Sequence, residues 1–129
     1  MRKFIKDYLA KEYDNYVKDL EALTNIDSGN GDLEGTEAAN KFVAAKMQAL
    51  GAETEFRYND RGCHLISRLK GKGTQTVLLV AHVDTVFKRG EAAKRPFRLD
   101  ANGFAWVPGV GDDQATVMDV IYGVAVLKE

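Results

Sequence analysis

Two short clusters of polar side chains in this chain have the composition of a metal site. His82 and Asp84 stand one residue apart, just after the apolar run Val77–Val80. Asp112 and Asp113 follow later and stand at the head of a second apolar run. Zinc in proteins is held by imidazole nitrogens, thiolates and carboxylates. A histidine and carboxylates delivered from loop starts therefore predict a zinc site.

The spacing of His82 and Asp84 favours a supporting contact between them. Side chains two residues apart in an extended segment share one face. The carboxylate of Asp84 can then accept the second imidazole N–H, which fixes the tautomer and leaves the other nitrogen for a metal. A histidine–aspartate pair without a metal has the same pattern in the sequence.

The adjacent aspartates have two interpretations. An extended backbone points neighbouring side chains in opposite directions, so only one of Asp112 and Asp113 is expected to reach the ion that His82 binds. Aspartate before a helix also acts as an N-cap or favours the positive helix end, with no metal involved. Gly109 and Gly111 before the pair, together with the earlier His-x-Asp pattern, favour the metal interpretation. His64, with no second Cys or His at ligand spacing, is predicted to be structural.

The elements that must position these clusters follow from hydrophobic patterning. The run Val77–Val80 with Ala81 predicts a strand buried on both faces, and ligands of open α/β sheets bind at the carboxyl ends of such strands. Residues 53–58 and 63–69 predict two further strands joined by a turn at 59–62. Asn102-Gly103 predicts a two-residue type I′ turn that joins strands at 97–99 and 104–106.

Three helices are predicted, over residues 2–23, 36–50 and 115–127, from apolar steps of three and four. Thr36 is the expected N-cap of the second helix. The third is apolar almost all round and is expected to be buried on nearly every side. Residues 25–32 predict a solvated loop, in which Asp27 and Asp32 offer a weaker cation-binding alternative.

Composition excludes several classes of protein. With 129 residues, 45% of them hydrophobic, the chain is long enough for one domain with a single core. The net charge is −1 and the basic residues are dispersed, so no nucleic-acid partner is expected. No apolar run is long enough to span a bilayer, and the single cysteine, Cys63, excludes an internal disulfide. We expect a soluble protein of the reducing cytoplasm.

Three motifs in order carry a family resemblance: His82-Val83-Asp84-Thr85-Val86, then Pro96-Phe97-Arg98, then Pro108-Gly109-Val110-Gly111-Asp112-Asp113. They resemble the metal-binding core of the zinc peptidases of family M20, and most of all the glutamate carboxypeptidases of the carboxypeptidase G type. The resemblance begins near Leu23 and spans nearly the whole chain after the first helix. It implies that His82 binds one zinc, that Asp112 bridges two zinc ions and that Asp84 orients His82. It also implies a cis peptide bond between Asp112 and Asp113.

The chain departs from the family pattern in three ways. Gln114-Ala115-Thr116 stands where the family has Lys-Gly-Gly, and Val107 stands where a glycine is common. The family's Glu–Glu pair, its remaining ligands and its lid domain would lie beyond these residues. We therefore expect residues 1–129 to be the N-terminal part of a single catalytic domain, an incomplete three-layer, mixed-sheet α/β fold of the zinc-peptidase type. Two ligands cannot complete a catalytic zinc site, so this chain alone should bind zinc weakly and hydrolyse nothing.

The resemblance implies a function for the intact protein. It would be a di-zinc carboxypeptidase or amidohydrolase that cleaves the amide bond of a C-terminal glutamate or another N-acylated amino acid, in small peptide or N-acyl amino acid substrates. The alternative is a non-catalytic scaffold or partner-binding module, which self-associates through an exposed apolar surface. A flavodoxin-like nucleotide binder is disfavoured, because no glycine-rich phosphate loop is present.

Overall fold

The computed structural model describes residues 1–128 and has a mixed α/β composition. The helices are α1 (Arg2–Thr24), α2 (Leu33–Ala49), α3 (Glu91–Lys94) and α4 (Ala115–Lys128), and the single turn η1 (Val110–Gln114) precedes α4. Two separate two-stranded antiparallel sheets are formed by β1 (Glu53–Asn59) with β2 (Gly62–Arg68) and by β3 (Arg98–Leu99) with β4 (Ala105–Trp106). The three predicted helices and both predicted hairpins are therefore present.

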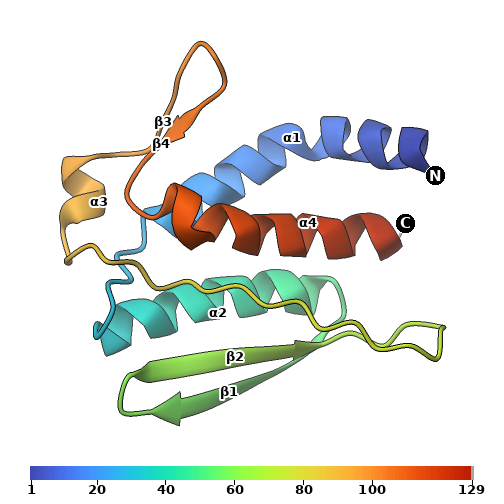
Figure 1. Ribbon diagram of the computed structural model, residues 1–129, viewed down its shortest axis with the longest axis horizontal. Helices are drawn as coiled ribbons and strands as arrows, with labels where there is room; N and C mark the ends of the chain where they lie inside the picture. Colours follow the sequence, from blue (N-terminus) through green and yellow to red (C-terminus); the bar gives the residue numbers. More distant parts are fainter. Residues whose placement is uncertain (129) are drawn as a thin grey trace.

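The core lies where α1, α2 and α4 meet. In Figure 1, α1 and α4 lie side by side, and α2 separates them from the β1–β2 hairpin. Leu23 of α1 and Met118 of α4 are fully buried at this junction. Two phenol hydroxyls brace α1 and α4: Tyr16 donates to Asp119 and Tyr122 donates to Asp19, each at 2.9 Å. Apolar residues of α2 and of its C-cap also pack here (Ala39, Phe42, Val43, Met47, Leu50).

The predicted start of α2 was wrong by one turn. The helix begins at Leu33, and its N-cap is Asp32, whose Oδ1 accepts a hydrogen bond from the backbone N–H of Gly35 at 2.9 Å. Thr36 lies inside the helix and donates its hydroxyl to the Asp32 carbonyl at 2.9 Å. An aspartate at this position satisfies a free N–H of the first turn and also interacts favourably with the helix dipole.

The strand predicted around Val77–Val80 is not formed. This segment is extended but pairs with no strand of residues 1–128, and its side chains are exposed by 78%, 84%, 53% and 79% in order. A buried strand needs partners on both edges and layers on both faces. In the described part of the chain β1 and β2 pair with each other, and the expected single mixed sheet is not present.

The last helix and the β3–β4 turn also differ from expectation. Helix α4 buries one face only, and Leu127 near its end is 82% exposed. The prediction that this helix is buried on nearly every side was therefore wrong. The β3–β4 turn is not type I′, because Gly103 has a positive φ of 84° whereas Asn102 does not. Instead the Asp100 carboxylate closes a longer loop by accepting the N–H groups of Asn102 and Phe104 at 2.9 and 3.0 Å.

Across residues 1–128, none of the helices combines the length and the hydrophobicity that a membrane span requires.

Candidate metal centre

The imidazole of His82 lies between two of the predicted carboxylates. Its Nε2 is 3.1 Å from Oδ1 of Asp112. Its Nδ1 is 3.1 Å from the backbone carbonyl oxygen of Asp84 and 3.3 Å from Oδ1 of the same residue. The structure thus brings together the three residues that the sequence singled out, from a loop after residue 80 and from the turn before α4. The His82 side chain is half exposed and that of Asp112 is 89% exposed, so the group faces solvent.

Asp113 contacts the backbone of His82 and not its imidazole, as expected for one of two neighbouring aspartates. Its Oδ2 accepts the backbone N–H of His82 at 3.2 Å. The Asp112–Asp113 peptide bond is cis, which confirms what the family resemblance implied. Both residues have backbone angles outside the helical region, so η1 is a turn that directs the two carboxylates to different atoms of His82.

A buried hydrogen-bond cluster holds the His82 segment in place. Ser28 donates its hydroxyl to the carbonyl of Val83 at 2.7 Å, and Thr85 donates its N–H to the Ser28 carbonyl at 2.9 Å. Gln114 donates from Nε2 to the Ser28 hydroxyl and to the Val83 carbonyl, at 3.3 and 3.4 Å. Ser28 and Gln114 are each only 1% exposed. These contacts fix His82 and Asp84 relative to the start of α4.

No motif in the sequence predicts this cluster. Residues 25–32 were predicted to be a solvated loop, which is wrong for Ser28 and Gly29, because both are buried and Gly29 forms a parallel bridge with Thr85. Asn30, also unpredicted, donates from Nδ2 to Oδ2 of Asp84 at 3.2 Å. The bond from Asn30 orients the carboxylate that in turn contacts the imidazole.

The two aspartates of the same loop have structural contacts. Asp32 caps α2 and pairs with the Arg89 guanidinium at 2.6 Å. Asp27 accepts the backbone N–H groups of Gly90 and Ala92 at 2.7 and 3.3 Å, at the start of α3. Protein donors therefore bind both carboxylates. These structural contacts explain the two aspartates without a bound cation.

The charges around His82 raise its pKa above the ordinary value of 6.5. Partial burial by itself lowers this pKa, because it disfavours the imidazolium. The hydrogen bond to the Asp84 carbonyl, the negative charge of Asp84, the hydrogen bond to Asp112 and the charge of Asp113 together outweigh burial. A divalent cation would compete with the proton for the same electron pair and the same negative field.

The donor set fits part of a zinc site. Two ligands about 2.0–2.1 Å from a tetrahedral zinc lie about 3.3 Å apart. The separation of 3.1 Å between His82 Nε2 and Asp112 Oδ1 is close to this value. Among residues 1–128, however, no group of three or more His, Cys, Asp or Glu side chains is arranged to hold a metal ion. The described residues thus supply two suitable donors and not the three that a catalytic zinc requires.

A groove of about 300 Å³ adjoins the His82 segment. Its lining includes residues 81–84, residues 61–65 at the start of β2, and Asn40 of α2. His64 also lines this groove, but its Nε2 contacts Asn59 Nδ2 at 2.8 Å within the β1–β2 hairpin. It lies outside the His82 cluster, as the sequence predicted.

Comparison with known proteins finds a relative that matches most of this chain. The chain is 37% identical over 117 residues to carboxypeptidase G2 from Pseudomonas sp. (strain RS-16), a match that covers 88% of this chain. This chain is a homologue of carboxypeptidase G2. The resemblance to the carboxypeptidase G type is thereby confirmed at the level of the sequence. The chain spans 28% of the length of carboxypeptidase G2, and no family model matches it.

Proposed function

We propose that this chain is part of the catalytic domain of a zinc-dependent carboxypeptidase or amidohydrolase of peptidase family M20. The observation that carries the proposal is the position of His82 Nε2 and Asp112 Oδ1, 3.1 Å apart on an open face with Asp84 behind the imidazole. The homology to carboxypeptidase G2 supports the same chemistry. With 28% of that relative's length present, residues 1–129 would be the N-terminal part of a domain with the three-layer zinc-peptidase fold.

His82 and Asp112 would hold the metal in this proposal, and Asp112 would bridge two ions. Bound zinc would polarise a scissile carbonyl and lower the pKa of bound water. Asp84 would keep the proton on Nδ1 of His82, so that Nε2 presents its lone pair. Asn30 would hold Asp84 in that orientation, and Asp113 would fix the backbone of His82. The general base and the other ligands would come from further glutamate, aspartate and histidine residues outside this chain.

The substrate class in this proposal is a small peptide or N-acyl amino acid with a C-terminal glutamate or a related residue. We further propose that the protein works in the cytoplasm, since its single cysteine, Cys63, is unpaired and buried. The isolated chain would bind zinc weakly and would not hydrolyse such substrates, because two donors leave a catalytic site incomplete.

A zinc titration of the 129-residue chain tests the metal assignment. Calorimetry should detect weak binding that His82→Ala and Asp112→Asn each reduce by at least tenfold. His64→Ala is the matched control, since it removes the other histidine, and it should leave the affinity within twofold. Equal losses in all three variants, or no loss in any, would contradict the assignment.

A chimera tests the activity. The chain would replace the 117-residue matching region of carboxypeptidase G2, and zinc-dependent hydrolysis of an N-acyl glutamate would be measured. Activity that is present in the chimera and falls at least 1,000-fold on His82→Ala supports the proposal. Turnover of the same substrate by the 129-residue chain alone would show that the site has been assigned to the wrong residues.

A second candidate function is partner binding by self-association, which one specific observation favours. Val77, Leu78 and Val80 are each at least 78% exposed in an extended segment without paired backbone. Contiguous exposed apolar side chains with free N–H and C=O groups favour addition of a β-strand from another chain. Leu78→Lys should shift the sedimentation of an associated chain to that of a monomer. Leu127→Lys, at an equally exposed leucine on α4, should not. A wild-type chain that is monomeric at all concentrations would exclude this function.

A further inference from the structure

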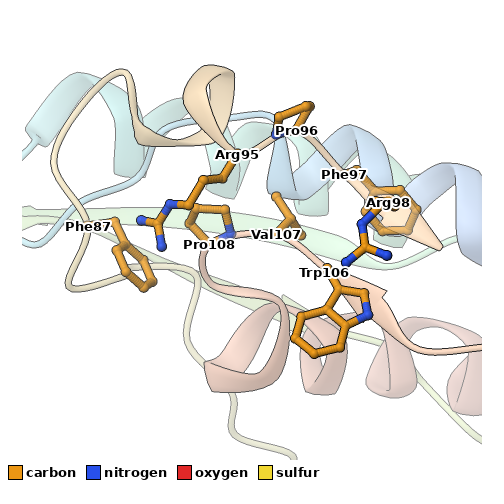
Figure 2. Close-up of a pocket in the computed structure, with 8 residues that line it drawn as sticks. All are labelled: Phe87, Arg95, Pro96, Phe97, Arg98, Trp106, Val107 and Pro108. Carbon is orange, nitrogen blue, oxygen red and sulfur yellow. The ribbon is translucent and has the colours of Figure 1, made fainter. Parts of the chain in front are cut away.

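A second cavity lies beside the β3–β4 hairpin and combines aromatic rings with guanidinium groups. Its volume is about 640 Å³, and its lining is distinct from that of the groove beside His82. Among its lining residues, Phe87, Arg95, Arg98 and Trp106 are here called the rim, and Val107 and Pro108, which lie between the two arginine–aromatic pairs in Figure 2, are called the floor. This is here termed the aromatic–arginine pocket. Its volume lies in the range of cavities that hold small organic ligands, roughly 300–1,000 Å³.

Two cation–π pairs define the rim of this pocket. The guanidinium carbon of Arg95 lies 4.8 Å from the centre of the Phe87 ring, and that of Arg98 lies 5.3 Å from the Trp106 ring. Figure 2 shows the two pairs on opposite sides of Val107 and Pro108. In each pair the guanidinium group lies next to its aromatic ring. A guanidinium group stacked on a ring keeps its N–H donors at its edge, where they can bind another group. In the Arg95 pair this edge is already hydrogen-bonded to Glu91 at 2.9 Å.

The hairpin fixes the Arg98–Trp106 pair before any ligand arrives. Arg98 and Trp106 are cross-strand partners in the β3–β4 register, so their side chains lie on one face. The indole N–H of Trp106 donates to Oδ2 of Asp100 at 2.9 Å, which sets the plane of the ring. Pre-ordered side chains lose less conformational entropy when a ligand binds.

The two guanidinium groups of the pocket differ in their ion pairing. Arg95 is paired with Glu91 at 2.9 Å, and this carboxylate neutralises it. Arg98 has no carboxylate within 4 Å in the part of the chain that the structure describes. The nearby Asp100 carboxylate accepts the N–H groups of Trp106, Phe104 and Asn102, and these bonds together with the charge of Arg98 lower its pKa. The exposed guanidinium of Arg98 is therefore free to form a bidentate bond to an oxyanion.

We propose that the aromatic–arginine pocket binds small aromatic monocarboxylates, with the carboxylate on Arg98 and the aromatic part between Trp106 and Phe87 above the apolar floor. One available guanidinium matches one carboxylate in charge and in fork geometry, and the rings of the rim provide stacking surfaces for an apolar body. The site is separate from the proposed zinc chemistry, because no residue of the His82 cluster lines it. It requires no metal.

Trp106 is the only tryptophan of the chain, so its fluorescence reports on this pocket alone. The probe is 3,3-diphenylpropionate, whose isolated phenyl rings absorb at shorter wavelengths than indole, and the neutral control ligand is its amide. Titration of the 129-residue chain, without zinc, should give a saturable change in Trp106 emission with the acid. The amide should bind at least tenfold more weakly, because it cannot pair with the charge of Arg98.

Variants assign the contact to one side chain. Arg98→Gln should weaken binding of the acid at least tenfold and remove the preference for the acid over the amide. Arg98→Lys should retain that preference at reduced affinity, since it keeps the charge and loses the fork. Arg2→Gln on α1 is the matched control and should bind as the unaltered chain does.

Three outcomes would overturn the proposal: absence of saturable binding below about 1 mM, equal affinity for acid and amide, and equal binding by Arg98→Gln and Arg2→Gln. Circular dichroism of each variant separates a lost contact from a lost fold. Because the assay contains neither zinc nor a hydrolysable substrate, its result is independent of the proposed peptidase function.

Discussion

The Ser28 hydroxyl is the side-chain contact that most directly ties the His82 segment to the rest of the fold. It donates to the Val83 carbonyl at 2.7 Å in a position that is 1% exposed, and it accepts from Nε2 of Gln114 at 3.3 Å. Substitution of Ser28 by Ala removes one donor and one acceptor, with almost no change in volume. The backbone bond from Thr85 to the Ser28 carbonyl remains, so the segment should stay attached while its carbonyl loses its shortest bond.

The expected loss in the free energy of unfolding follows from the hydrogen bond that the Val83 carbonyl loses. A neutral hydrogen bond contributes about 1 kcal/mol to stability, and a buried group left without a partner costs about 1–3 kcal/mol. After the substitution, the Val83 carbonyl retains only the Nε2 donor of Gln114, at 3.4 Å. We therefore expect Ser28→Ala to lower the free energy of unfolding by about 2 kcal/mol, which is roughly a 30-fold change in the ratio of folded to unfolded chain.

Urea denaturation followed by circular dichroism measures this change. Ser67→Ala in β2 is the control, because that hydroxyl makes no side-chain hydrogen bond within residues 1–128, and it should cost less than about 0.5 kcal/mol. The double variant of Ser28 and Gln114, both to Ala, should cost less than the sum of the single variants, since the two side chains share partners. A Ser28→Ala chain as stable as the Ser67→Ala chain would refute the role assigned to this cluster.

Three further predictions concern charge, metal binding and backbone conformation. Arg89→Gln should destabilise the chain only slightly at neutral pH, because the ion pair with Asp32 is exposed to solvent on the side of Arg89. Because the Arg89 hydrogen bond lowers the pKa of Asp32 from 3.8, the difference should vanish in urea titrations as the pH falls through that lowered pKa. Zinc affinity measured by calorimetry should rise with pH and level off above 6.5, since the raised pKa of His82 keeps its imidazole protonated to a higher pH. Gly109→Ala should lower the free energy of unfolding, measured by urea denaturation, by more than about 1 kcal/mol, because φ is +84° there and a Cβ would lie 2.6 Å from Thr85 Cγ2.

Local patterns in the chain were sufficient for the elements that make their own contacts. Helix α1 was predicted almost to the residue, because its apolar stripe is regular and its packing surface is supplied within the described chain. The β1–β2 hairpin followed from alternation and from the turn at 59–62, which needs only its own two strands. The start of α2 was misplaced because two residues, Asp32 and Thr36, both satisfy the N-cap preference, and the contact of Asp32 with Arg89 is not visible in the sequence.

By itself, the sequence determined the residue types at the candidate site and the kinship with carboxypeptidase G2, because both are properties of short motifs in order. Only the tertiary structure decided which atoms meet. The contact of Ser28 and Gln114 with Val83 joins three segments that are far apart in the chain, and no local spacing encodes it. The same reason explains the failure at Val77–Val80: apolar composition expresses a tendency to be buried, whereas burial requires neighbouring strands, and residues 1–128 provide none for this segment.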